Sequence, residues 1–461
     1  MLTVHLRIND SVTGQPTPAR VRVTSCDGTE YAPLGRFVEF PTGRNEAVGG
    51  QVLIGSTRWF YIDGWCEIRL PTGVPLRVQI TKGPEYTPLD ETLTLGSGQL
   101  SLRFALHHQL RLPAGSWARI DSRCHFLTPH DALLEAEAEG LDVVNLLATL
   151  QLFPSLDGTA YPTVPNLSAF SGQQPALERN GRQVIVNTFN THPVLGKVAL
   201  LHSHRPVYPL TFGGEETDDW GICDWCDQCH RKGGLVVWVE AFEPAARLVG
   251  GEALVAAILG KIDTIEVTRQ PRVVPLLPWV YRLWNAGFRV PLIGASGKDS
   301  NRVALGTVRT YARVDDSSWV EAVRCGQTFV TTGPLVTLEL IGRQARATVQ
   351  SLLPPGPLEL VINGEVVAST AADTLETVVP EHGWVAARCH GPDGGFAHTS
   401  PLGFGSPSPP TSAVTALVRL IDQTREWAEL HGRYDNLKRR DQLLARCDEA
   451  RQKLQSSLVL R

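Results

Sequence analysis

Two histidines separated by a single residue, His202 and His204, form the first pattern that could support metal chemistry. On a strand, both rings would lie on one face, where they could bind zinc or copper. The motif is short, and it stands between the strand-like run Val198-Ala-Leu-Leu and the loop-forming Arg205-Pro-Val-Tyr-Pro. A structural position at the end of a strand is the favoured interpretation, and ligation is the alternative.

Three cysteines at intervals of three, Cys223, Cys226 and Cys229, are followed by His230 and include a Cys-x-x-Cys-His motif. This spacing occurs at c-type haem attachment sites and could also begin a zinc site. Haem attachment requires export, and the strand-like N-terminus has no signal-peptide pattern, while zinc would need further ligands from elsewhere. We therefore expect these thiols to lie on one helix face in the core and to bind nothing.

A polar loop, Gly294-Ala-Ser-Gly-Lys-Asp-Ser-Asn301, follows the apolar run Val290-Pro-Leu-Ile. It lacks the spacing of a nucleotide P-loop, but the end of a barrel strand is where ligands are held. Lys298 and Asp299 offer a donor and an acceptor, and Arg309 and Tyr311 on the next strand-like segment could reach the same place. Ligand binding and a purely structural loop are both compatible with these residues. No Gly-x-Ser-x-Gly elbow is present, so a covalent nucleophile is not predicted.

The segments that must position these residues fall into regions of different periodicity. Residues 1–112 alternate in short runs such as Val4-His-Leu-Arg-Ile and Leu76-Arg-Val-Gln-Ile, which predicts a β-sandwich. Residues 113–333 repeat a step of helix, glycine and apolar strand, for example Asp131 to Gly140 followed by Leu141-Asp-Val-Val, which predicts a parallel sheet with helices. Periodicity leaves open whether this sheet closes.

The pattern changes again after Thr332-Gly-Pro. Residues 334–404 return to strand alternation and predict a small β domain, and residues 405–411 read as a Ser/Pro-rich linker. Residues 412–461 carry apolar side chains at helical spacing, interrupted at His431-Gly432, and predict a helical hairpin that packs on the main body.

Taken in order, the steps around Asp121-Ser-Arg-Cys-His125, Cys229-His-Arg-Lys-Gly-Gly, Ile262-Asp-Thr-Ile-Glu-Val and Arg324-Cys-Gly-Gln-Thr-Phe-Val-Thr-Thr-Gly-Pro resemble the CehA/McbA-like group of PHP-type metallohydrolases. The resemblance covers residues 113–404, and the N-terminal region is similar to the transthyretin-like (carboxypeptidase-regulatory-like) sandwich that often precedes such proteins. It implies an α/β fold with a distorted βα (PHP/TIM-like) barrel, flanked by the sandwich, the C-terminal β domain and the hairpin.

The resemblance also implies a metal centre of histidines and carboxylates, and most of its positions are altered here. The expected His-x-His after Asp121 is Arg123 and His125, and an expected Asp-His step falls on Ala148 and Thr149. Asn187 and Lys197 match a carboxylate and a histidine, and Glu240 stands for another histidine. Gly297 occupies the place of an aspartate, with Asp299 two positions later.

Cations at two of these positions change the expected chemistry, because Lys and Arg cannot ligate a metal while charged. We expect Arg123 and Lys197 to neutralise Asp121, Glu240 and Asp299 in place of a metal. The favoured hypothesis is a homologue that has lost its hydrolytic centre and binds a small polar or anionic ligand or a partner, at a pocket that also includes His125, Lys298 and Arg309. One alternative is an active zinc, manganese or iron hydrolase of esters, carbamates or phosphoesters, with His125, His202, His204 and Glu240 as ligands. Another is a structural or interaction protein.

Composition and charge limit the partners. The formal charge of −4 and the absence of arginine-lysine runs argue against nucleic acid, and no long apolar run predicts a membrane span. The chain has nine cysteines, an odd number, and they are scattered along the sequence. This pattern is typical of free, mostly buried thiols in a reducing compartment, so we expect a cytoplasmic protein. A small molecule or a protein is the predicted kind of partner.

Overall fold

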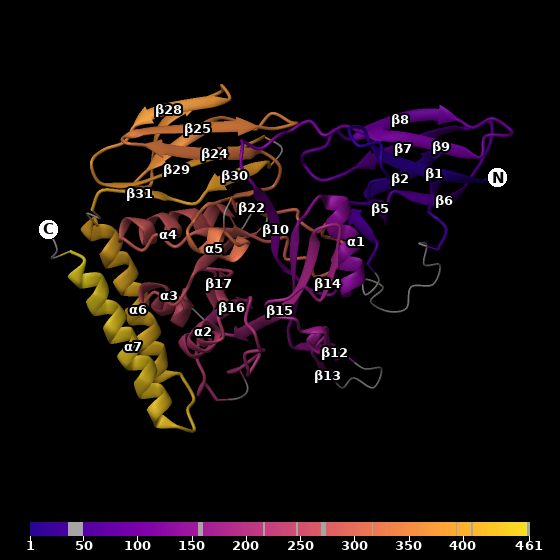
Figure 1. The fold of residues 1–461 in the computed structure, drawn as a ribbon. Helices are drawn as coiled ribbons and strands as arrows, with labels where there is room; N and C mark the ends of the chain where they lie inside the picture. The colour runs from indigo at the N-terminus through magenta and orange to yellow at the C-terminus, as the bar shows by residue number, and fades with distance from the viewer. Residues whose placement is uncertain are drawn as a thin grey trace.

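The computed structural model describes residues 1–35, 49–154, 160–214, 217–245, 248–268, 273–315, 317–392, 394–406 and 409–458. These residues form a mixed α/β fold in which a large sheet connects two β-rich ends, with helices along one side (Figure 1). Among the described helices, none combines the length and the apolarity that crossing a lipid bilayer would need.

The N-terminal region consists of two sheets that enclose one apolar core, whose members include Val4, Leu6, Ile68, Leu76 and Val78. The alternating burial of these strands confirms the strand pattern predicted from the sequence, since every second side chain points inward. One sheet contains β1 (Leu2–Asp10), β6 (Trp65–Leu70) and β9 (Ser101–Leu106). The other contains β2 (Ala19–Ser25), β3 (Glu30–Tyr31), β4 (Gln51–Ile54), β5 (Thr57–Ile62), β7 (Pro75–Thr81) and β8 (Leu89–Thr94).

The central part of the large sheet runs in the order β21, β20, β17, β16, β15, β11, β10 and β22. The predicted parallel pairing is found for β10 with β11, β11 with β15, and β17 with β20 and β21. β16 and β22 run antiparallel to their neighbours, so the sheet is mixed and not wholly parallel as predicted. The reason is local, because β15 returns directly into β16 through a short turn without a crossover helix. The bounds are β10 Trp117–Cys124, β11 Val143–Ala148, β15 Arg182–His192, β16 Gly196–Leu201, β17 Leu235–Val239, β20 Thr264–Val267, β21 Leu292–Gly294 and β22 Arg309–Arg313.

The sheet curls so that β21, at one end of the strand order, approaches β10. The backbone N–H of His125, just beyond β10, donates to the Lys298 carbonyl, which follows β21 (2.7 Å), and the Gly297 N–H donates to the Arg123 carbonyl (3.0 Å). The enclosed side chains, including Ile120, Val143, Ile185, Val237 and Ile293, form a continuous apolar core. The carboxyl-terminal ends of β10, β17, β20 and β21 therefore meet at one rim of this curled sheet. We call this rim, which includes Arg123, His125, Lys197, Glu240 and Glu266, the mouth.

The helices cover the outer face of this sheet, and each predicted helix–strand step is present. α1 (Pro129–Glu139) begins at the Thr128 cap, whose side chain accepts from the Asp131 N–H, and ends at Gly140 with a φ of 71°. Burial of α2, α3 and α4 against the sheet builds the largest apolar cluster of the described residues. The remaining helices of this region are α2 (Ile222–Arg231), α3 (Gly251–Ile258), α4 (Val273–Asn285) and α5 (Trp319–Arg324).

The hydrogen-bonded ladder continues into the C-terminal β region, because β23 pairs with β22 on one side and with β30 on the other. The regions before and after the predicted boundary at residues 333 and 334 therefore share one continuous sheet, although the boundary itself falls in the loop that follows β23. This sheet extends through β23 (Thr328–Thr331), β30 (Phe396–Thr399), β29 (Gly383–His390), β26 (Leu358–Ile362) and β27 (Glu365–Thr370), with β31 (Leu402–Phe404) beside β29. A second layer of β24 (Leu335–Ile341), β25 (Gln344–Gln350) and β28 (Thr374–Val378) packs on it.

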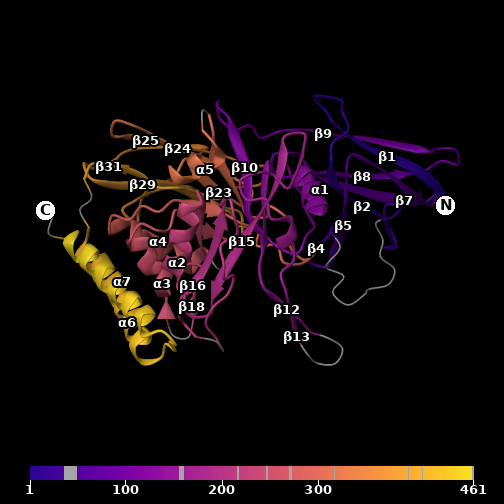
Figure 2. The ribbon, with the colours of Figure 1, turned by 60° about the horizontal axis from the view of Figure 1, so that its bottom comes forward.

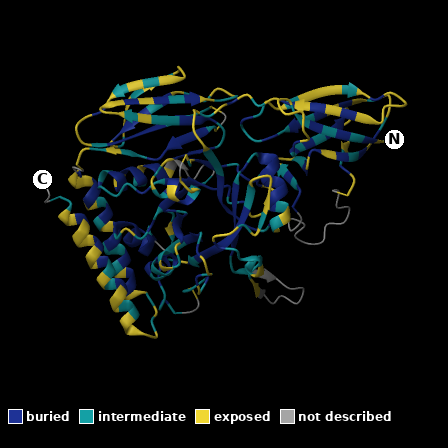
Figure 3. Ribbon diagram, in the orientation of Figure 1, coloured by how far each residue is buried: buried dark blue, intermediate teal, exposed yellow. Residues whose placement is uncertain are grey.

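Two antiparallel helices, α6 (Thr411–Leu430) and α7 (Leu437–Ser456), lie along the edge opposite the N-terminal sandwich (Figure 2). Their apolar faces, including Leu417, Ile421, Leu443 and Cys447, join the core formed by α2, α3 and α4, while the outer faces are exposed (Figure 3). The helical spacing predicted at these positions is confirmed. Short additional strands are β12 (Gln151–Pro154), β13 (Ala160–Thr163), β14 (Leu177–Arg179), β18 (Pro244–Ala245) and β19 (Leu248–Val249).

Candidate functional site

The site is built around an irregular end of β10. The pairing of β10 with β11 shifts register between Asp121 and Cys124, and such bulges re-aim side chains at strand ends. Asp121 is fully buried, and its carboxylate accepts hydrogen bonds from the backbone N–H groups of Ser296 (3.0 Å), Gly306 (2.8 Å) and Arg123 (3.3 Å). Burial raises the pKa of Asp121, and these hydrogen bonds oppose the shift. Asp121 therefore joins three backbone segments, while the charged side chains of Arg123 and Lys197 pair with other carboxylates.

Arg123 occupies the centre of the mouth and forms a two-point ion pair with Glu266 on β20. Its Nε and Nη2 donate to the two carboxylate oxygens at 2.7 and 2.8 Å, and both side chains are buried. Burial disfavours the charge of Arg123, but the Glu266 carboxylate outweighs burial and raises the guanidinium pKa. Sequence reasoning missed Glu266, although a carboxylate inside the otherwise uncharged run Thr264-Ile-Glu-Val was a usable signal.

His125 is held next to this pair as a neutral ring. Its Nδ1 lies 3.2 Å from the Leu147 carbonyl oxygen, which can only accept, so Nδ1 carries the proton. Nε2 is then the acceptor, and it faces Nη1 of Arg123 at 3.4 Å. Burial and the Arg123 charge together lower the pKa of His125 to about 3. The ring nitrogen that could bind a metal is thus already occupied by a guanidinium.

Lys197 and Glu240 form a second ion pair at the outer edge of the mouth, joining β16 to the end of β17. An ion pair between a cation of this set and one of the expected carboxylates was predicted, and this pair confirms it. The lysine is 40% exposed, in contrast to the 9% of Arg123. Beside the pair lies a small hollow of about 110 Å³, bordered by His192, Trp238 and Phe242. Its volume corresponds to only three or four waters, at ~30 Å³ each.

Three other predicted pocket residues lie away from the mouth. Lys298 is fully buried, donates to the Val303 carbonyl at 2.8 Å, and lies 3.3 Å from the carboxylate of Glu135 on α1. Asp299 is exposed and contacts Ser300. Arg309 donates to the carbonyl oxygens of Gly306 and Glu139 on the outer side of the sheet. The prediction of one shared pocket is therefore wrong, because consecutive loop residues and alternate strand residues point to different faces.

The two isolated motifs do not converge on a common centre. His202 packs edge-on against Trp319, with ring centroids 6.2 Å apart, while Nδ1 of His204 lies 2.7 Å from the Lys232 carbonyl oxygen. Cys223, Cys226 and Cys229 all lie on α2 and are buried, as predicted for core thiols. Burial raises the pKa of each of them.

The donor set does not fit the metal centre that the resemblance implies. Across the described residues, no group of three or more His, Cys, Asp or Glu side chains is placed to hold one ion. The family-matched Asn187 instead donates to Oδ1 of Asn145 at 3.1 Å, beneath the mouth. In this buried amide pair, Nδ2 of Asn145 and Oδ1 of Asn187 find no partner among the described residues. The buried polar groups in and beneath the mouth are thus paired amides and ion pairs, which do not form a set of metal ligands.

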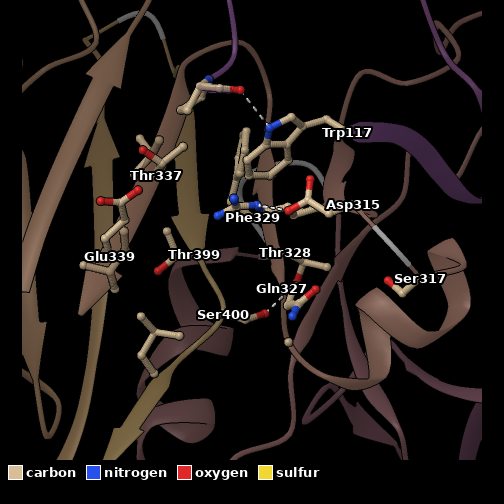
Figure 4. Close-up of a pocket in the computed structure, with 16 residues that line it drawn as sticks. Trp117, Asp315, Ser317, Gln327, Thr328, Phe329, Thr337, Glu339, Thr399 and Ser400 are labelled. Atoms are coloured by element: carbon tan, nitrogen blue, oxygen red, sulfur yellow. Dashed lines mark hydrogen bonds and ion pairs between the residues drawn. The ribbon is translucent and has the colours of Figure 1, made fainter. Parts of the chain in front are cut away.

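A larger pocket that sequence reasoning did not foresee lies between β23 and β24, at the opposite end of β10 (Figure 4). It measures about 530 Å³, and its wall includes the rings of Trp117 and Phe329, which meet edge-on at 5.7 Å between centroids. Thr328 and Ser400 hydroxyls on the floor are bonded to each other at 2.7 Å, and Arg313 is paired with Asp315. Four of its polar side chains are thus already paired with one another.

Comparison with known proteins adds little to this geometry. No family model matches the chain, and no curated protein matches it. Among solved structures, the lesion-specific endonuclease PfuEndoQ from Pyrococcus furiosus is similar over 46% of this chain, with 13% identity and a TM-score of 0.29. The match spans 56% of that protein's chain.

Proposed function

We propose that this chain is a homologue of the PHP-type metallohydrolases, with a distorted βα barrel of the CehA/McbA-like kind, that binds a small polar or anionic ligand or a partner without metal-dependent hydrolysis. The observation that carries the proposal is the buried two-point ion pair between Arg123 and Glu266 at the centre of the mouth. The resemblance of the sequence supports the proposed family, and the ion pair in the mouth supports the proposed loss of activity.

Electrostatics explains why this arrangement opposes a metal. A divalent ion ~4 Å from a guanidinium would be repelled by about 8 kcal/mol at an effective dielectric of ~20. Glu266 cannot offset this readily, because both of its oxygens already accept from Arg123. His125 presents its only free nitrogen to the same guanidinium. A hydrolytic centre needs about three or four available ligands and an open position for water.

The size of the hollow at the outer edge of the mouth also argues against a hydrolase substrate there. The hollow beside Lys197 and Glu240 measures about 110 Å³, which is smaller than the ~300 Å³ at the lower end of organic-ligand pockets. An aryl ester or carbamate would not fit there without movement of Trp238 or Phe242. This hollow is therefore better suited to water or a small ion than to a hydrolase substrate.

The proposal is tested by comparing wild type with the double variant Arg123→His, Lys197→His. We expect wild type to show no hydrolysis of aryl esters, carbamates or phosphomonoesters with added zinc or manganese, and to bind neither metal in calorimetric titration. The double variant should gain measurable zinc affinity, because two cations are replaced by neutral ligands. Arg302→Gln and Arg419→Gln, at exposed positions outside the mouth, together serve as a charge-matched control and should leave metal binding unchanged.

Metal-dependent turnover by wild type would replace this proposal with the active hydrolase that uses a rearranged site. Failure of the double variant to bind zinc while remaining folded by circular dichroism would show that the two cations are not what excludes the metal.

A further inference from the structure

Two hollows adjoin where the N-terminal sandwich, the central sheet and the C-terminal β region meet. In Figure 1 the N-terminal sheets and β24–β25 lie on the same side of the central sheet. The first hollow, here named the junction pocket, measures about 360 Å³ and is lined by Arg20, Glu139, Arg302 and Arg309. The second, here named the apolar groove, measures about 600 Å³. Both are bordered by Gly83, Pro84, Thr307 and Thr332, so they are neighbours.

One of the three arginines in the junction pocket, Arg20, forms an ion pair with Glu139, which lines the same pocket. Nη1 of Arg20 lies 3.4 Å from Oε1 of Glu139, and the Tyr61 hydroxyl donates to the same carboxylate oxygen at 2.8 Å. Burial opposes the charge of Arg20, but Glu139 outweighs it and raises the guanidinium pKa. Among the described residues that line the pocket, Glu139 is the one carboxylate, and it is therefore already paired.

The other two guanidiniums keep their charge without an acidic partner among the described residues. Arg309 is 4% exposed, and its Nε and Nη1 donate to neutral carbonyl oxygens, those of Gly306 and Glu139, at 2.8 and 2.7 Å. Arg302 is exposed, and its side chain has no hydrogen bond or ion pair within the described ranges. Two positive charges thus border a hollow in which the one carboxylate of the described lining, that of Glu139, is paired with Arg20.

The apolar groove has the opposite character. Its lining includes Pro84, Pro88, Pro334, Leu352 and Leu353, and proline has no backbone N–H to donate. Leu353 is 65% exposed, which leaves a large aliphatic side chain open to the groove. The hydroxyl of Tyr86 is turned away to Asp10, with 3.1 Å between Oη and Oδ2. A ligand in this groove would meet mainly carbon atoms.

We infer that the two hollows together bind a small amphiphile: a monocarboxylate with an unbranched alkyl chain. Its carboxylate would meet Arg302 and Arg309 in the junction pocket, since guanidinium and carboxylate match in charge and planar geometry. Its chain would cross the shared border at Pro84 and Thr332 and cover Leu352 and Leu353 in the groove. Each volume lies within the ~300–1,000 Å³ usual for organic-ligand pockets. The mouth takes no part in this binding.

The test is calorimetric titration of the full-length protein with decanoate, decan-1-ol and butanoate. Decanoate should bind at least about a hundredfold more tightly than butanoate, because six methylenes are removed from water. It should also bind about tenfold more tightly than decan-1-ol, which lacks the charge. A negative heat-capacity change for decanoate, absent for butanoate, would report burial of the chain.

Two surface variants locate the site. Arg302→Gln should weaken decanoate about fivefold and leave decan-1-ol unchanged, since only the charged group is lost. Leu353→Ser should weaken decanoate and decan-1-ol alike, by about fivefold. Arg419→Gln and Ile341→Ser, at exposed positions outside both hollows, are the matched controls and should change neither.

Equal affinity for decanoate and decan-1-ol, or insensitivity of decanoate to both Arg302→Gln and Leu353→Ser, would overturn the inference. Absence of decanoate binding would overturn it as well. None of these results depends on whether the mouth binds metal, so the inference and the proposed function can fail separately.

Discussion

Arginines at the mouth and at the junction pocket occupy opposite electrostatic settings. Arg123 lies in the mouth with both carboxylate oxygens of Glu266 on its guanidinium, whereas Arg309 is equally buried but bonded only to carbonyl oxygens. The first arrangement leaves no charge to offer a ligand, and the second leaves a positive charge beside a hollow. Buried arginine is therefore not by itself a sign of a binding site, because the partner on the guanidinium decides what the residue can do.

Removing the partner of Arg123 should have the largest effect on stability. Glu266→Ala leaves a buried, unpaired guanidinium, and breaking a buried ion pair in this way costs about 3–5 kcal/mol. Urea unfolding followed by tryptophan fluorescence measures the loss. Arg302 is exposed and its side chain has no partner within the described ranges, so Arg302→Gln should change the free energy of unfolding by no more than about 0.5 kcal/mol. A loss below about 1 kcal/mol for Glu266→Ala would mean that the pair is not held in the dry interior, contrary to the geometry described above.

The neutral state of His125 gives the second effect, which depends on pH. The pKa of this histidine falls from 6.5 to about 3 on folding. Between pH 6.5 and pH 3 the imidazole is therefore protonated in the unfolded chain and neutral in the folded chain. Stability is then lost as pH falls from 6.5 toward 3, by about 2 kcal/mol between pH 7 and pH 5 from this residue alone. The variant His125→Gln should lose about 2 kcal/mol less than wild type over that interval. His398, whose pKa is also lowered to about 3 by burial, is present in both proteins and cancels in the comparison. If the free energy of unfolding changed with pH in the same way in wild type and in His125→Gln, protonation of His125 would not be the cause of the loss of stability.

The outer pair of the mouth should give the smallest effect. Lys197 is 40% exposed, so Lys197→Met should cost about 1 kcal/mol or less, as for other solvated ion pairs. High salt should reduce the difference from wild type further. A loss as large as that of Glu266→Ala would mean that both pairs are equally desolvated and would remove the distinction between the centre and the edge of the mouth.

Much of the secondary structure could be predicted from periodicity, because glycine stops and apolar runs are local signals. The helix ending at Gly140 and the spacing of Leu443 and Cys447 are examples. The antiparallel return of β15 into β16 could not be predicted, since a pairing direction depends on contacts distant in sequence.

The candidate site was predicted only in part, and for a similar reason. Arg123 or Lys197 was expected to pair with one of the carboxylates at positions 121, 240 and 299, and Lys197 pairs with Glu240. Glu266 was not expected, because its role arises from a strand 143 residues beyond Arg123 in the chain. Lys298, Asp299 and Arg309 were grouped by sequence proximity, yet a turn and the alternation of the strand send them to different faces.

The most direct test of the central claim is the metal content of wild-type protein purified without chelator, measured by plasma mass spectrometry against protein concentration. If Arg123 and Lys197 take the place of a metal through their carboxylate partners, zinc, manganese and iron should each be far below one ion per chain. The same preparation should show no hydrolysis that chelation abolishes. Stoichiometric zinc, manganese or iron, lost together with hydrolytic activity on chelation, would contradict the account and establish an active metal centre.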